Sequence, residues 1–225
     1  RTCHAAIVSR ELNTPALVGA HGATKKIKNG QEITIDCSGG AHGVVYNGAI
    51  PFEVEELNIE RIPQAPVEVM VNIGDPGNAF AVSQLPVDGV GLARIEFIIT
   101  SMVKVHPMAL LEPRSIKSKK VRNQIEKLAA PYPSHKQFFI DTLAQGIGMI
   151  AAGFYPRPVI VRLSDFKTNE YRNLLGGEQF EQEEANPMLG FRGAARYTHE
   201  LYQDAFLLEC AALKQVREEM GFDNV

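Results

Sequence analysis

The stretch DGVGLARIEF, at residues 88–97, reads as a strand that is apolar along most of its length and carries Arg94 near its end. Two similar stretches flank it, VEVMVNIG at residues 67–74 and PVIVRLSDF at residues 158–166. Near-continuous apolar strands are typical of parallel sheets, because both faces of such a sheet are covered by helices. The three stretches therefore predict a parallel α/β sheet.

Helices are expected between and after these strands. Residues 103–155 read as mostly helical, and residues 200–220 predict an amphipathic helix that ends at Gly221. Three βα units that do not close on themselves are typical of part of a (β/α)8 barrel of the TIM type. The apolar face expected of the last helix consists of Leu201, Ala205, Leu208, Ala212 and Val216.

The first 50 residues have the pattern of half of a small α/β domain. A short helix is expected over residues 4–12, with Thr2 or Cys3 at or near its N-cap. A short buried strand is expected at ALVG, residues 16–19. Two more strands are expected on either side of a glycine-rich turn, one around Ile33, Ile35 and Cys37 and one at the end of GGAHGVVYNG.

Residues 51–66, PFEVEELNIERIPQAP, are rich in proline and glutamate and show no clear period. Such a change of composition often marks a domain boundary, so we interpret this stretch as a linker. The predicted organisation is a first domain at residues 1–50, the linker, and a second domain at residues 67–225.

The composition is that of an ordinary globular protein, with 225 residues, 45% hydrophobic residues and a net charge of −3. It does not favour binding to nucleic acid or to an anionic membrane, and we read the basic stretch at residues 113–128 as the solvated face of a helix. Three widely spaced cysteines and the lack of a long apolar run predict a cytoplasmic protein. The first residue is not Met, which we take as a sign of a longer parent chain.

His4 allows three interpretations. It is a packed structural residue, a metal ligand, or a nucleophile at the start of a helix. Metal binding would need partners at ligand spacing, and neither His21 nor His42 offers a recognisable one. A neutral imidazole near a helix N-terminus is a good phosphoryl acceptor, because the helix dipole favours the neutral ring and then the phosphate. The residues alone leave the structural reading slightly ahead.

The arginines follow a recurring pattern. Arg94 and Arg162 both come late in apolar strands, and Arg192 lies in a glycine-containing loop that leads into a helix. Charged side chains at the carboxyl ends of barrel strands line the active-site mouth, and guanidinium groups match phosphate and carboxylate. The alternative is pairing within the chain, Arg94 with Glu96 and Arg162 with Asp165. The acidic stretch at residues 177–185 reads as a solvated loop rather than a metal site.

Four motifs follow one another along the chain: RTCHAAIVSRELNTPALVG (residues 1–19), GVGLARIEF (89–97), VIVRLSDFKTNEY (159–171) and ANPMLGFRGAARY (185–197). In this order they resemble the phosphoenolpyruvate-utilising enzymes. The first resembles the phosphohistidine signature of that family, and the other three resemble the first arginine motifs of its substrate barrel. The resemblance implies the C-terminal half of a swivelling phosphohistidine β/α domain, followed by the first three βα units of a (β/α)8 barrel.

Within the family, the chain most resembles the member that converts ATP, pyruvate and water into phosphoenolpyruvate, AMP and phosphate. This resemblance implies that His4 is the phosphorylated histidine, that Arg94 and Arg162 bind the substrate, and that Arg192 lies near the phosphoryl group. The alternatives are pyruvate phosphate dikinase, Enzyme I of the sugar phosphotransferase system, and a non-catalytic barrel fragment that binds an anion.

The same resemblance implies partners and cofactors. ATP would bind an upstream domain, and the Mg²⁺ ligands and a cysteine proton donor would lie downstream of residue 225. Cys210 would then be a packing residue. A regulatory kinase/phosphorylase would modify Thr2, where a phosphate adds negative charge next to His4. Related enzymes are homodimers, so a homodimer is expected, and the 225 residues alone are expected to be inactive.

Overall fold

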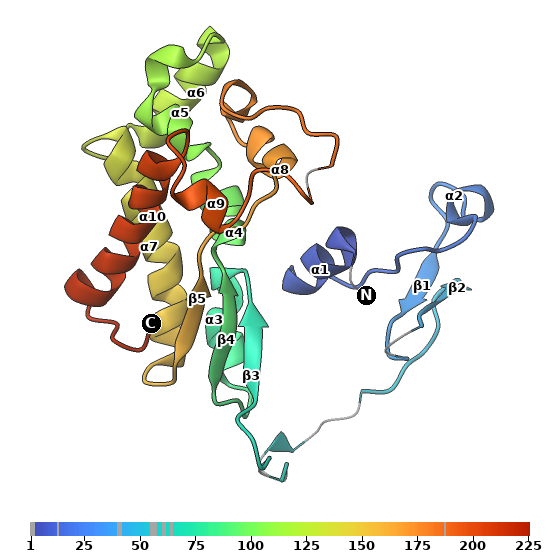
Figure 1. Ribbon diagram of the computed structural model, residues 1–225. Helices are drawn as coiled ribbons and strands as arrows, with labels where there is room; N and C mark the ends of the chain where they lie inside the picture. The colour runs from blue at the N-terminus through green and yellow to red at the C-terminus, as the bar shows by residue number, and fades with distance from the viewer. Residues whose placement is uncertain are drawn as a thin grey trace. The chain divides into compact units, whose positions relative to one another are not determined.

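The computed structural model divides the chain into two compact units, residues Arg1–Pro63 and Gln64–Val225 (Figure 1). The structure describes residues 3–12, 14–39, 42–54, 58–59, 62–63, 65–186 and 188–225.

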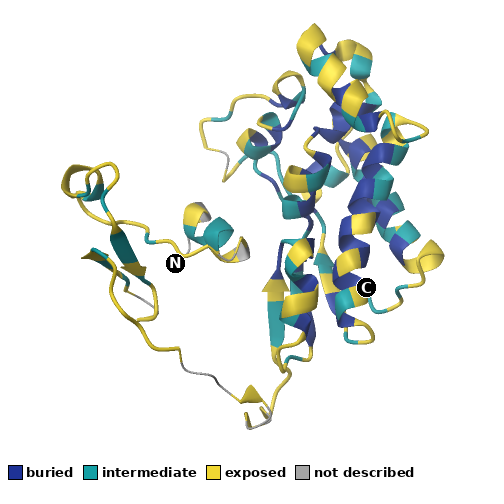
Figure 2. Ribbon diagram, turned by 180° about the vertical axis from the view of Figure 1, so that it is seen from behind, coloured by how far each residue is buried: buried dark blue, intermediate teal, exposed yellow. Residues whose placement is uncertain are grey.

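The first unit contains helix α1 (His4–Glu11), helix α2 (Ala23–Lys26) and an antiparallel pair of strands, β1 (Ile33–Asp36) and β2 (Val44–Asn47). The helix predicted at the start of the chain and the two strands around the glycine-rich turn are therefore confirmed. Cys37, however, lies one residue beyond the end of β1. This unit buries little: most of its residues are exposed or half-buried in Figure 2.

The strand predicted at ALVG, residues 16–19, was wrong. This segment has no strand conformation, and three of its four residues are exposed. Only the side chain of Leu17 is half-buried, close to the backbone of Gly43. A short apolar run becomes a strand only when a neighbouring backbone offers it hydrogen bonds, and in the described part of this unit β1 and β2 pair only with each other.

The second unit is built on a three-stranded parallel sheet, as predicted. Its strands are β3 (Met70–Ile73), β4 (Gly89–Arg94) and β5 (Val159–Arg162), in the spatial order β3-β4-β5. Val90, Ala93 and Val159 are buried under the helices, while Ile160 points to the other face and is 55% exposed.

The long helix α7 (His135–Phe154) is the centre of the helical layer. It packs on β4, β5, α3 (Ala79–Ser83) and α10 (Gln203–Lys214). Figure 2 shows the buried residues concentrated along α7, α10 and the facing side of the sheet. The remaining elements of this unit are η2 (Pro76–Asn78), α4 (Ile95–Ile98), η3 (Ile99–Val103), α5 (Pro107–Leu111), η4 (Pro113–Ser115), α6 (Lys119–Ala129), α8 (Thr168–Arg172), η5 (Gly177–Gln179), α9 (Ala194–Tyr197) and η6 (Gln215–Glu219).

Several predicted boundaries were wrong. The strands expected over residues 67–74 and 158–166 are shorter, at Met70–Ile73 and Val159–Arg162. The strand expected over residues 88–97 ends at Arg94, and the chain turns at once into α4, where Ile95 and Ile98 are buried at helical spacing. The last helix begins at Gln203 rather than residue 200, which leaves Leu201 outside it and exposed. The other four predicted positions of its apolar face are buried: Ala205, Leu208, Ala212 and Val216.

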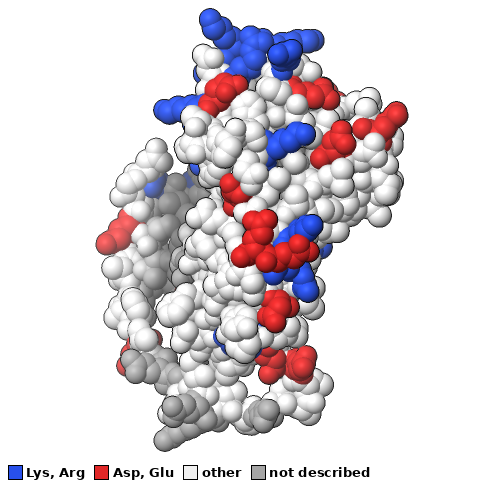
Figure 3. All heavy atoms as spheres, turned by 90° about the vertical axis from the view of Figure 1, so that its left-hand side faces the viewer, with Lys and Arg blue, Asp and Glu red and all other residues white. Residues whose placement is uncertain are grey.

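The basic stretch at residues 113–128 is solvated, as predicted. Its helix, α6, buries Ile125 and Ala129 and exposes Lys119, Lys120 and Lys127. Figure 3 shows basic side chains gathered at the end of the molecule that carries α6. None of the helices in the described parts of the chain has both the length and the apolar composition needed to cross a bilayer.

Candidate functional site at the carboxyl ends of the strands

Two of the predicted arginines lie side by side at one edge of the sheet. Arg94 is the last residue of β4 and Arg162 the last residue of β5, and they are register partners. Paired residues of neighbouring strands point to the same face, about 5 Å apart. The fold therefore brings together two arginines that are 68 positions apart in the sequence (162 minus 94).

Glu96 fixes one of these arginines. It lies in the first turn of α4, where its carboxylate forms an ion pair with Arg162 and accepts a hydrogen bond of 2.9 Å from the backbone N–H of Asp165. Its second oxygen, Oε2, is buried and has no hydrogen-bond partner among the described residues. The carboxylate thus ties β5 and the loop after it to the start of α4.

Arg192 joins the same group through Asp165. Its Nε and Nη2 atoms donate to the two carboxylate oxygens of Asp165 at 3.1 and 2.7 Å, a bidentate arrangement. These hydrogen bonds raise the pKa of Arg192. The pairing of Arg162 with Asp165 considered from the sequence is therefore wrong. Arg162 pairs with Glu96 because the chain turns into α4 there, which leaves Asp165 to Arg192.

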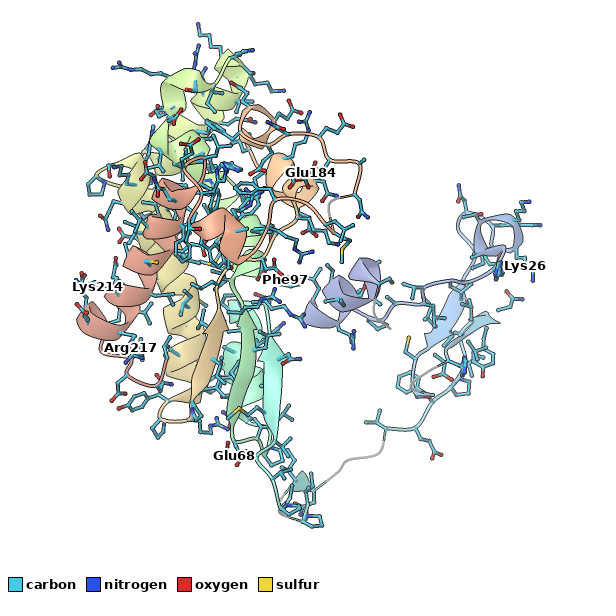
Figure 4. The ribbon with its side chains drawn as sticks, in the orientation of Figure 1. Lys26, Glu68, Phe97, Glu184, Lys214 and Arg217 are labelled. Carbon is cyan, nitrogen blue, oxygen red and sulfur yellow. The ribbon has the colours of Figure 1, made fainter. Side chains whose placement is uncertain are left out.

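We call these five residues the arginine cluster: Arg94, Arg162, Arg192, Glu96 and Asp165. Its three guanidinium groups come from two strand ends and one loop, and its two carboxylates hold two of them in place. Figure 4 labels Phe97, the residue that follows Glu96 in α4. Such a fixed set of cations suits a small ligand with several negative charges.

A buried ion cluster supports the loop that carries Arg192. Glu181 accepts hydrogen bonds from both Nη atoms of Arg196, one of them at 2.5 Å, and bonds to Nε2 of His106 at 2.9 Å. The acidic stretch around Glu181 was therefore only partly the solvated loop that we expected, because Glu181 is 5% exposed. Arg196 also packs against two aromatic rings: its guanidinium lies 4.4 Å from the ring centres of Tyr171 and Phe191.

Burial and charge oppose each other inside this ion cluster. Burial lowers the pKa of His106, although its bond with Glu181 acts in the opposite direction. Burial alone would raise the pKa of Glu181, but the hydrogen bonds from Arg196 and His106 lower it on balance. The same loop is held at another point by Glu184, labelled in Figure 4, whose Oε1 accepts from the N–H of Phe191 at 2.8 Å.

His4 is the first residue of α1, and Cys3 occupies the N-cap position without a side-chain cap. The predicted position of the histidine at the start of a helix is therefore confirmed, while its side chain and Thr2 lie outside the described part of the chain. Among the described residues, no three His, Cys, Asp or Glu side chains gather closely enough to hold a metal ion.

Sequence comparisons identify the class of protein to which this sheet and its arginines belong. The family described as PEP-utilising enzyme, PEP-binding domain, matches residues 53–225, and the one described as PEP-utilising enzyme, mobile domain, matches residues 1–40. The chain belongs to the PEP-utilising enzyme family.

Its relatives include phosphoenolpyruvate synthases. The chain is 52% identical over 225 residues to the phosphoenolpyruvate synthase of Helicobacter pylori and 50% identical over 226 residues to that of Synechocystis. It is 49% identical over 225 residues to that of Escherichia coli. Each match covers 100% of this chain and 28% of the relative, so the chain spans a little over a quarter of the length of these proteins.

Proposed function

We propose that this chain is part of an enzyme with the phosphoenolpyruvate synthase (pyruvate, water dikinase) activity, which forms phosphoenolpyruvate, AMP and phosphate from ATP, pyruvate and water. The observation that carries the proposal is the arginine pair at the ends of β4 and β5, in a chain about half identical to proteins of that name. Because the chain spans only 28% of these relatives, the activity belongs to a longer parent protein.

The finer architecture is part of the proposal. Residues 1–50 would be the C-terminal half of a swivelling phosphohistidine domain, residues 51–66 a linker, and residues 67–225 the first three βα units of a (β/α)8 barrel. The parallel order β3-β4-β5 supports the barrel. So does the exposed face of β5, since an apolar side chain such as Ile160 would be covered once further strands closed the sheet.

His4 would carry the phosphoryl group. In the transfer step, a base outside this chain, the cysteine that the family resemblance implies, would take a methyl proton from pyruvate. The enolate oxygen would then bond to phosphorus as the bond between phosphorus and the imidazole nitrogen breaks. Arg94 and Arg162 would neutralise the carboxylate and the developing enolate, and Arg192 would bind the phosphoryl oxygens. Phosphoryl transfer depends mainly on positioning and charge neutralisation, which fixed guanidinium groups provide.

The parent enzyme would use ATP, bound by an upstream domain, and Mg²⁺, held by ligands outside this chain. A magnesium ion neutralises phosphoryl charge when it is bound. We further propose a regulatory kinase/phosphorylase that acts on Thr2, a homodimeric parent protein and a cytoplasmic location. Three free cysteines support a reducing compartment.

The test uses the full-length parent protein with phosphoenolpyruvate labelled with ³²P, and magnesium. We expect acid-labile label on the His4 peptide. His4→Ala should abolish both the label and the synthesis of phosphoenolpyruvate, while the matched control His21→Ala, at an exposed histidine of the same unit, should retain both.

Product analysis separates the family's reactions. Release of orthophosphate from ATP and pyruvate supports the synthase, whereas consumption of orthophosphate with release of pyrophosphate indicates a dikinase of the other type. Phosphorylation of a carrier protein indicates Enzyme I. Normal synthesis of phosphoenolpyruvate by the His4→Ala protein would contradict the proposal.

A further inference from the structure

A buried carboxyl lies directly behind the arginine cluster. Glu209, in the middle of α10, is fully buried. Ser164 donates to it twice: the backbone N–H reaches Oε2 at 3.1 Å, and the hydroxyl bonds to Oε1. In the described part of the chain no lysine, arginine or histidine forms an ion pair with Glu209. Burying a carboxylate without a cationic partner costs free energy, which the hydrogen bonds from Ser164 offset in part.

Three tyrosines complete the surroundings of Ser164. The hydroxyl of Tyr171, on α8, lies 2.8 Å from Oγ of Ser164 and accepts a hydrogen bond of 2.6 Å from Tyr202. The hydroxyl of Tyr197, on α9, donates to the backbone carbonyl of Ser164 at 2.7 Å. The N–H, the carbonyl and the hydroxyl of this one serine are thus all fixed from neighbouring elements.

Ser164 lies between two residues of the arginine cluster in the sequence. It comes two residues after Arg162 and immediately before Asp165, which holds Arg192. A shift of its backbone would move both neighbours, and with them two of the three guanidinium groups of the arginine cluster. Glu209 itself is too deeply buried to touch a substrate.

We propose that Glu209 is a positioning residue for the pyruvate half of the reaction: its carboxylate fixes Ser164 and so aligns Arg162 and the Asp165-bound Arg192. This inference rests on the proposed function. It assigns to Glu209 a role in the transfer from phosphohistidine to pyruvate and none in the phosphorylation of His4 by ATP, because the arginine cluster serves only the former step.

The two donors of Ser164 require two acceptor oxygens. An ionised carboxylate supplies both, whereas a protonated carboxyl or an amide turns one of them into a donor. Burial raises the pKa of Glu209 to about 7, partly offset by the hydrogen bonds from Ser164. The other ionisable groups that act on Glu209 or are affected by it are Glu96 on α4, Tyr171 on α8, Tyr197 on α9, Tyr202 before α10, and Cys210 on α10 itself.

The test compares Glu209→Gln with wild type in the full-length protein. We expect kcat/KM for pyruvate to fall about ten- to hundredfold, the range for losing hydrogen bonds to a charged group. Labelling of His4 by ATP should proceed at the wild-type rate. The wild-type profile of kcat/KM should fall below about pH 7, and this acid limb should be lost in the variant. The matched control is Glu218→Gln, at a glutamate that is 64% exposed on the same helical run.

Ser164→Ala provides a second route to the same result. It removes the hydroxyl but keeps the backbone N–H, so it should impair transfer to pyruvate less than Glu209→Gln. The two changes together should cost less than the sum of the single effects. Unimpaired transfer to pyruvate in both variants, with an active wild type, would overturn this inference alone. A wild-type protein that does not phosphorylate pyruvate at all would overturn the proposed function, and this inference with it.

Discussion

Replacing Arg196 by Met should strongly destabilise the second unit. The guanidinium of Arg196 is 1% exposed, donates two hydrogen bonds to Glu181 and lies over the rings of Tyr171 and Phe191. Met preserves much of the contact with the rings. The buried carboxylate of Glu181 is then left with His106 as its side-chain partner among the described residues. Breaking a buried ion pair from one side costs about 3–5 kcal/mol. That is a large share of the roughly 5–15 kcal/mol by which a whole domain is stable.

Urea unfolding at pH 7, followed by far-ultraviolet circular dichroism, measures this loss. The chain contains no Trp, so tryptophan fluorescence is not an option. The control is the double variant Arg196→Met with Glu181→Gln. It removes both charges and should recover a substantial part of the lost stability, because the penalty comes from the unpaired carboxylate. A loss below about 1 kcal/mol in the single variant, or no recovery in the double variant, would refute this reasoning.

Further predictions concern pH, packing and positioning. The pKa of Glu209 rises on folding from 4.5 to about 7, so between these pH values the folded state binds more protons than the unfolded state. The free energy of unfolding of the wild type should therefore fall as the pH rises from about 4.5 to about 7. Urea unfolding at pH 4.5 and at pH 8 measures this. From the lower to the higher pH, the wild type should lose about 3 kcal/mol more of its free energy of unfolding than Glu209→Gln does. Gly146→Ala should destabilise by about 1–2 kcal/mol, because the new Cβ would lie 2.5 Å from a methyl carbon of a core isoleucine. Gly148→Ala in the same helix should be neutral or stabilising, since its Cβ would lie 3.1 Å from the flexible sulfur of Met220 and at an ordinary contact distance, 3.7 Å, from the ring of Phe222. Thermal unfolding compares the two variants. Glu96→Gln should raise the KM for pyruvate in the full-length enzyme about tenfold, because it weakens the ion pair that orients Arg162, and steady-state kinetics would show an unchanged KM if this is wrong.

Predictions that depended on local patterns succeeded more often than those that depended on distant partners. The three apolar strands and the buried positions Ala205, Leu208, Ala212 and Val216 follow from periodicity, which reflects which face of an element is covered. Two of the failures came at the strand expected over residues 16–19 and at residues 95–97. In both places the outcome depends on whether a neighbouring backbone is present to continue a ladder of hydrogen bonds, and periodicity does not report this.

The sequence by itself determined the alternation of apolar strands and helices, the family motifs around His4, Arg94, Arg162 and Arg192, and hence the class of chemistry to expect. Only the tertiary structure decided which carboxylate pairs with which arginine. In the fold, Glu96 forms an ion pair with Arg162 and Asp165 forms one with Arg192, while the carboxyl of Glu209 is buried behind them. The physical reason is that periodicity records only whether a position faces core or solvent, whereas charge pairing depends on distances between residues tens of positions apart.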